Sequence, residues 1–171
     1  MSTLSEPVNQ LASVMPHDLE SILLVEDDAD HARLIMKAFK DHGHLMNKIY
    51  WVKNGLDAIA FVSRTGQYKD QDIPRPALIL LDINLPLKDG FQVLEELKTS
   101  EQYKAIPIVM LTTTRSLDDV EKALKLGAND YIVKPVKFAD FIKKVGQLGH
   151  YWAFVSNARL SSIEKKESHK Q

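Results

Sequence analysis

The sequence predicts an α/β fold in which a five-stranded parallel sheet carries helices on both faces. Five short runs of apolar residues alternate with segments of helical period, and most connections between them are short. A strand that is apolar at nearly every position is typical of a parallel sheet covered on both faces. The 171 residues suffice for one such domain and are too few for two of ordinary size.

The first half of the chain predicts two strand–helix pairs. An apolar stripe at helical spacing follows the first apolar run, and Gly43 stands where a C-cap glycine belongs. Asn54, with Asp57 three residues later, has the pattern of a capping box. The predicted elements are a strand over 21–25, a helix over 29–42, a strand over 48–52 and a helix from 54 to about 64.

The second half predicts three more strands with their helices. It begins with a polar segment, 65–76, whose glycine and two prolines indicate a loop. Ser116 with Asp119 repeats the capping-box pattern, and Gly127 ends the helix that carries it. The predicted elements are a strand over 77–81, a helix from about 90 to 99, a strand over 106–111, a helix over 116–127, a strand over 131–133 and a helical segment from 137 onward.

The predicted connections leave few arrangements of the strands. Right-handed crossovers favour the common flavodoxin-like (βα)₅ order, 2-1-3-4-5. We expect residues 1–20 to form a flexible arm, 21–155 the domain and 156–171 a polar tail.

Composition excludes several functional classes. Lys plus Arg number 22 against 23 Asp plus Glu, so no basic excess calls for nucleic acid or an anionic membrane. The most apolar run, 77–87, is too short to span a bilayer and is interrupted by Asp82 and Asn84. The absence of cysteine, together with an N-terminus unlike a signal peptide, is compatible with a cytoplasmic protein.

Polar side chains follow the predicted strands at the edge where such sheets bind ligands. Glu26, Asp27 and Asp28 follow the first strand, and the third strand ends at Asp82. The fourth strand ends at Thr112 and the fifth at Lys134. Clustered carboxylates need a cation or shifted pKa values, and ligands that are all oxygens suit Mg²⁺ or Mn²⁺. A carboxylate beside Mg²⁺ can attack phosphorus, and Asp82, alone at the end of the central strand, is the predicted nucleophile.

Four separated segments carry a resemblance to a known family. The stretches LLVEDD, LLDINLPLKDG, PIVMLTT and GANDYIVKP resemble the signature segments of response-regulator receiver domains, over roughly residues 20–150. The resemblance implies that Asp82 is the phosphorylation site and that Lys134 contacts the phosphoryl group, with a cis bond from Lys134 to Pro135. It further implies that the ligands of Mg²⁺ are Glu26, Asp27, Asp82 and the main-chain carbonyl of Asn84. The implied switch pair is Thr112 and Tyr131.

Some features narrow the resemblance, and two depart from it. The Pro-Arg-Pro insertion before the third strand, the Leu-Thr-Thr triplet and the aromatic C-terminal segment are similar to small regulators that partner bacterial and cyanobacterial phytochrome kinases. Glu26 stands where Asp is usual, which would alter how the metal is held. Thr113 stands where Ala is usual, and we expect it to crowd the phosphoryl site.

The C-terminal segment carries an apolar stripe longer than the sheet can cover. Such a stripe either folds back on the domain or forms a protein interface, and we favour a symmetric homodimer. Its members are Phe141, Val145, Leu148, Trp152 and Val155.

These observations favour a non-enzymatic single-domain response regulator that accepts phosphate from a histidine kinase, a phytochrome in the narrower resemblance. Its output would be dimerisation, partner binding or transfer to a histidine phosphotransfer protein. One alternative is a Mg²⁺-dependent phosphatase, although Asn84 stands where such enzymes have a second Asp. A flavin-binding protein is disfavoured, because the acidic loop after the first strand would repel a phosphate. The other alternative is a pseudo-receiver that binds partners without phosphorylation.

Overall fold

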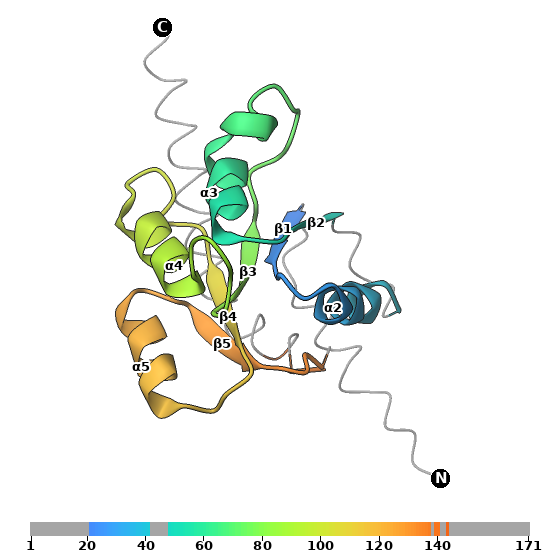
Figure 1. The fold of residues 1–171 in the computed structure, drawn as a ribbon, viewed down its shortest axis with the longest axis vertical. Coiled ribbons are helices and arrows are strands. Elements are labelled where there is room, and N and C mark those ends of the chain that lie inside the picture. The colour runs from blue at the N-terminus through green and yellow to red at the C-terminus, as the bar shows by residue number, and fades with distance from the viewer. Residues whose placement is uncertain (1–20, 42–47, 138, 141–142, 144–171) are drawn as a thin grey trace, which may run out of the picture.

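The computed structural model describes residues 21–41, 48–137, 139–140 and 143. Strands alternate with helices in the order that the sequence predicts (Figure 1). The elements are β1 (Ser21–Val25), α2 (Ala29–Asp41), β2 (Lys48–Val52), α3 (Gly55–Ser63), the 3₁₀ helix η1 (Gly66–Tyr68), β3 (Leu78–Asp82), α4 (Gly90–Thr99), β4 (Ile108–Thr112), α5 (Leu117–Lys125) and β5 (Asp130–Val133).

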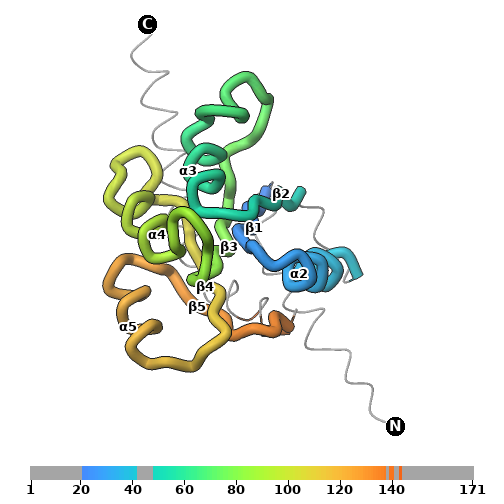
Figure 2. The backbone as a smooth tube through the Cα atoms, viewed as in Figure 1, coloured from blue at the N-terminus to red at the C-terminus, as the bar shows by residue number. Residues whose placement is uncertain are grey.

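The five strands form one parallel sheet in the order β2-β1-β3-β4-β5, which confirms the predicted flavodoxin-like topology. β1 lies between β2 and β3, so the strand order reverses beside it. The tube in Figure 2 follows the chain as it leaves β1 for α2, and the segment after β5 runs toward the same helix. The carboxyl ends of β1, β3 and β5 therefore open toward one region of the molecule.

The sheet buries a separate core on each face. On one face α2 packs through Ala32, Ile35 and Phe39 against the strands. On the other face α3, α4 and α5 supply apolar side chains such as Phe61 and Leu94. Figure 1 shows this division, with α2 on the side of the strands opposite α3, α4 and α5. β1, β3 and β4 are buried at every position, as expected for strands covered on both faces.

Some element boundaries differ from the predicted ones. β4 begins at Ile108 and not at Ile106, because Pro107 has no N–H to give to the ladder. The long loop contains η1, which the sequence did not predict. In α5 the buried side chain is Ala123, whereas Leu117 and Leu124 are exposed.

Side-chain caps fix the starts of three helices. The Asn54 and Ser116 side chains accept from the backbone N–H three residues on, as predicted. The Asp57 carboxylate accepts from the side-chain amide of Asn54 and not from its backbone N–H. The full capping box lies at α4, between Asp89 and Gln92, where the sequence reading overlooked it.

Several predictions fall outside the described residues. They concern the arm over 1–20, the Gly43 cap, the apolar C-terminal stripe and the tail over 156–171. Within the part of the chain that the structure describes, no helix is both long and apolar enough to cross a membrane.

Candidate functional site

Three carboxylates meet at the carboxyl ends of β1 and β3. Glu26 and Asp27 directly follow β1, and Asp82 is the last residue of β3. One oxygen of each lies within 4.8 Å of the others, with Glu26 and Asp82 buried and Asp27 exposed. Because β1 and β3 are adjacent parallel strands, their ends bring these residues together.

The backbone around Glu26 is tied to the neighbouring strand. Its N–H donates to the carbonyl of Val52 at 3.1 Å, and its own carbonyl accepts from the Trp51 indole at 2.7 Å. The side-chain oxygen Oε1 accepts from the N–H of Asp28 at 3.1 Å. These contacts hold both the backbone and the carboxylate of Glu26. The side chain, which is longer than the Asp usual in the family, therefore has a defined position.

Asp82 is fixed in a similar way by the turn that follows it. Its Oδ1 accepts from the N–H of Asn84 at 3.1 Å, which places the Asn84 backbone beside the carboxylate. The N–H of Gly90 donates to the carbonyl of Ile83 at 2.9 Å, which folds the start of α4 against the same turn. A Cβ at Gly90 would overlap the carbonyl oxygen of Asp82, and this close approach requires glycine.

Lys134 closes the site from β5. Its N–H donates to the carbonyl of Thr112 at 2.7 Å, which continues the sheet beyond both strands. Its Nζ lies 2.7 Å from Asp82 Oδ2 and 2.5 Å from Glu26 Oε2, and its side chain is only 6% exposed. The cis bond from Lys134 to Pro135, expected from the resemblance, is present.

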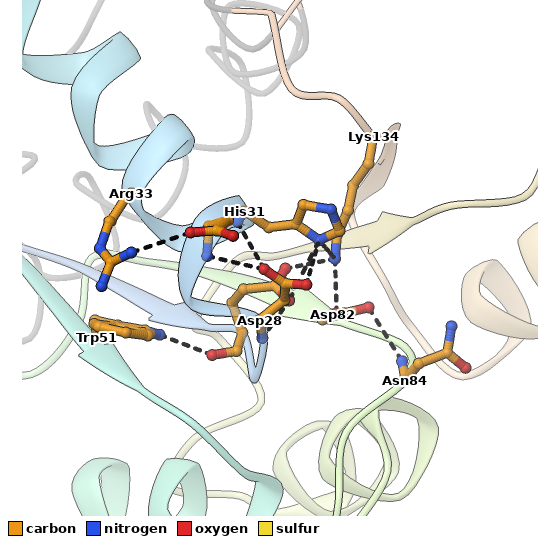
Figure 3. A network of polar contacts seen from close by, with 9 residues as sticks. Asp28, His31, Arg33, Trp51, Asp82, Asn84 and Lys134 are labelled. Carbon is orange, nitrogen blue, oxygen red and sulfur yellow. Dashed lines mark hydrogen bonds and ion pairs between the residues drawn. The ribbon is translucent and has the colours of Figure 1, made fainter.

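A third side chain, which the sequence analysis missed, also contacts the Lys134 ammonium. His31 lies in the first turn of α2, and its Nδ1 is 3.3 Å from the Nζ of Lys134 (Figure 3). The same Nδ1 is 3.9 Å from Glu26 Oε1. The sequence could have pointed to His31 only through its position, because the first turn of the helix after β1 borders the strand ends.

The predicted switch residues, Thr112 and Tyr131, border Lys134. The Thr112 hydroxyl turns into its own loop, donating to the Thr114 carbonyl at 2.9 Å and accepting from the Thr114 N–H at 3.1 Å. Tyr131 is half-buried and, with Lys134, lines a cavity of about 500 Å³. Thr113 is exposed.

Burial and charge shift the proton affinities at the site. Burial raises the pKa of Glu26 to about 7, opposed by the hydrogen bond from Lys134 and assisted by the charge of Asp82. Burial acts to lower the pKa of Lys134, but hydrogen bonds and charge from Asp82 and Glu26 outweigh it, so this pKa is raised. Two buried carboxylates share one ammonium, so a proton on Glu26 would make this group of three neutral.

The donor set fits a hard divalent cation. Carboxylate oxygens are the ligands that Mg²⁺ prefers, and three of them converge from Glu26, Asp27 and Asp82. Lys134 neutralises part of the same charge through Glu26 and Asp82. A cation and the ammonium therefore compete for two of the three carboxylates.

The raised pKa of Glu26 predicts a specific pH dependence of stability. The folded state holds the Glu26 proton more tightly than the unfolded state, whose pKa is near 4.5. Stability should therefore fall as pH rises from about 4.5 to about 7 and then level off. Relative to Glu26→Gln, we expect the native protein to lose about 2 to 3 kcal/mol between pH 5 and pH 8. Urea unfolding in metal-free buffer measures this difference, and parallel pH curves for the two proteins would contradict it.

Comparison with known proteins identifies a family match over most of the chain and relatives that are regulatory proteins. Residues 22–146 match the family described as the response regulator receiver domain. The chain is 40% identical over 131 residues to the probable methanogenesis regulatory protein FilR2 of Methanothrix harundinacea, covering 77% of this chain and 82% of that protein. It is also 40% identical over 131 residues to response regulator Rcp1 of Synechocystis sp., covering 77% and 87% respectively.

Solved structures of high similarity include regulators that are named after phytochromes. The bacteriophytochrome response regulator RtBRR has a TM-score of 0.70 at 39% identity, covering 77% of this chain and 78% of that one. The Mn²⁺-bound form of Rcp1 has a TM-score of 0.64 at 39% identity, covering 78% and 94%. The phosphorylated cyanobacterial phytochrome response regulator RcpA has a TM-score of 0.65 at 35% identity, covering 78% and 94%.

Proposed function

This chain belongs to the response regulator receiver family, and on that premise we propose that Asp82 accepts a phosphoryl group from a histidine kinase while Mg²⁺ is bound. The contact between Asp82 and Lys134 supports this proposal most strongly. A buried carboxylate at the end of the central strand, 2.7 Å from an ammonium, is a nucleophile beside a group that can neutralise phosphoryl oxygens.

The proposed step is a group transfer from nitrogen to oxygen. A carboxylate oxygen of Asp82 forms a bond to phosphorus as the P–N bond of a phosphorylated histidine breaks. The electron pair of that bond stays on the imidazole nitrogen of the kinase. Lys134 stays beside the product, where its ammonium can donate to a phosphoryl oxygen. Charge neutralisation and positioning are the main contributions that a protein makes to such transfers.

Glu26, Asp27 and Asp82 are the residues that would hold Mg²⁺ through side-chain oxygens. The main-chain carbonyl of Asn84 is the proposed fourth protein ligand. When bound, Mg²⁺ supplies positive charge against the oxygens of the transferred group. The Mn²⁺-bound form of Rcp1 supports a divalent-cation site in a similar protein.

The proposed output is a change in the surface of the domain. Thr112 would leave its bonds to Thr114 to reach the phosphoryl group, and Tyr131 would change its position with it. A phytochrome kinase is the proposed donor, because RtBRR and RcpA are named as phytochrome response regulators. Onward transfer to a histidine phosphotransfer protein is a further proposed route. We also propose a homodimer through the C-terminal apolar stripe.

Binding of partners without phosphorylation is the second candidate function. It is favoured by Lys134, whose ammonium pairs with both buried carboxylates and offsets part of their charge without a metal. It is disfavoured by the convergence of three carboxylates, which a purely structural site would not need.

Intact-mass spectrometry after incubation with acetyl phosphate distinguishes the two functions. We expect one phosphoryl adduct that requires Mg²⁺ and is absent in Asp82→Asn. Asp89→Asn is the matched control, because Asp89 caps α4 and is not among the proposed site residues. Absence of an adduct from acetyl phosphate and from candidate histidine kinases, in a folded protein that binds Mg²⁺, would contradict the proposal and favour the second function.

A further inference from the structure

Among the described residues, the imidazole of His31 contacts the Lys134 ammonium alongside two carboxylates. The ammonium has two carboxylate partners, Asp82 and Glu26, and the imidazole as a third. An ammonium has three N–H donors and no lone pair, so the Nδ1 of His31 must accept and the ring proton lies on Nε2. Asp82 and His31 accept hydrogen bonds from the ammonium at 2.7 and 3.3 Å, and Glu26 forms an ion pair with it.

The backbone of His31 is held in place by the cap of its own helix. Asp28 Oδ1 accepts from the N–H of Asp30 at 2.9 Å and from that of His31 at 3.0 Å. The next residue, Ala32, is fully buried against the sheet. The imidazole therefore projects over the strand ends from a fixed turn, as Figure 3 shows. Its other neighbours, Glu26 and Asp28, are 3.9 and 4.0 Å away, beyond hydrogen-bond distance.

The contact between His31 and Lys134 matters because a bound cation would compete with Lys134 for the carboxylates of Glu26 and Asp82. With Mg²⁺ bound, the carboxylates of Glu26 and Asp82 would be shared between two cations. Lys134 must then loosen at least one of its two ion pairs, and a buried ammonium that loses a partner is costly. An imidazole is a poor ligand for Mg²⁺, so His31 remains available to Lys134.

We propose that His31 is a positioning residue, whose Nδ1 holds the Lys134 ammonium when Glu26 and Asp82 bind a divalent cation. This inference rests on the proposed function, because it presumes the cation site. In this proposal His31 does not contact the cation. Its action runs through Lys134.

Mg²⁺ affinity measured by tryptophan fluorescence tests this role. The chain has two tryptophans, and Trp51 donates to the Glu26 carbonyl at 2.7 Å, so all proteins carry Trp152→Phe to leave Trp51 as the single reporter. We expect His31→Leu to weaken Mg²⁺ binding by about three- to tenfold, the effect of a hydrogen bond between a buried charged group and a partly exposed imidazole. His31→Asn keeps an acceptor at the same distance along the side chain and should stay within about twofold of the parent protein.

Two further variants separate the positioning role from its rivals. In a Lys134→Ala background, where Mg²⁺ has no ammonium to displace, His31→Leu should have no effect. Arg33→Ala, on the same helix but paired only with exposed Asp30, controls for changes in α2.

The results that would overturn the inference are distinct. An unchanged Mg²⁺ affinity in His31→Leu would overturn it, and so would an effect that persists without Lys134, because His31 would then act directly on the cation. If His31→Asn proved as weak as His31→Leu, the acceptor atom would not be what matters. A parent protein with no saturable response to Mg²⁺ would refute the proposed metal site itself, and with it this inference.

Discussion

Lys134→Met is expected to lower the free energy of unfolding by about 3 kcal/mol at pH 8 in metal-free buffer. The substitution leaves Glu26 and Asp82 buried beside each other without the ammonium that lies 2.5 and 2.7 Å from them. Mg²⁺ should restore most of this loss, because a cation that binds only the folded state stabilises it. The variant should also bind Mg²⁺ more tightly than the native protein, since Lys134 no longer competes for the carboxylates.

Urea unfolding with and without Mg²⁺ measures both parts of this prediction. Lys125→Met is the matched control, because Lys125 forms an exposed pair with Glu121 and its loss should cost no more than about 0.5 kcal/mol. If Lys134→Met were as stable as the control in metal-free buffer, Lys134 could not be the group that neutralises the buried carboxylates. A loss that Mg²⁺ leaves unchanged would argue against a cation site at Glu26 and Asp82.

Gly90→Ala is expected to destabilise the protein by about 3 kcal/mol and to disturb the turn that holds Asp82, the proposed phosphoacceptor. A Cβ at this position would overlap the Asp82 carbonyl oxygen and lie 2.7 Å from the Ile83 Cα. Both neighbours are backbone atoms, so the turn after β3 would have to move, and Asp82 with it. Phosphorylation by acetyl phosphate should therefore slow in the fraction that remains folded.

Gly66→Ala provides the comparison for this substitution. Gly66 has a φ of 54°, and a Cβ there would meet nothing within 4 Å. Its replacement therefore introduces left-handed backbone strain alone, about 1 kcal/mol, and no collision. Thermal unfolding of the two variants checks the difference. A smaller loss for Gly90→Ala than for Gly66→Ala would mean that the turn after β3 yields easily.

The fold could be predicted because its signals are local and repeated. Each of β1, β3 and β4 is a short apolar run, and the alternation with helices leaves few topologies. The strand ends then follow from the topology, so the sequence alone predicts that Glu26, Asp82 and Lys134 lie close together, as they do. The topology predicts which residues lie near one another. It does not predict which of their side-chain atoms are in contact.

The rest depends on side-chain geometry that no pattern encodes. His31 resembles any polar residue in a first helical turn, and only the path of Lys134 from β5 makes it a partner. Leu117 and Leu124 have the spacing of a buried stripe, yet α5 buries Ala123 and leaves both leucines exposed. The direction of the Thr112 hydroxyl is likewise set by a local contact, its hydrogen bond to the Thr114 carbonyl.

The site of phosphoryl attachment is the most direct test of the account. After incubation with acetyl phosphate and Mg²⁺, borohydride reduces an aspartyl phosphate to homoserine, and peptide mass spectrometry locates the converted residue. We expect homoserine at position 82 alone, and none in protein treated without Mg²⁺. Conversion at Asp27 or Asp89 in place of Asp82, or a phosphoryl adduct that resists reduction, would contradict the assignment of Asp82 as the phosphoacceptor.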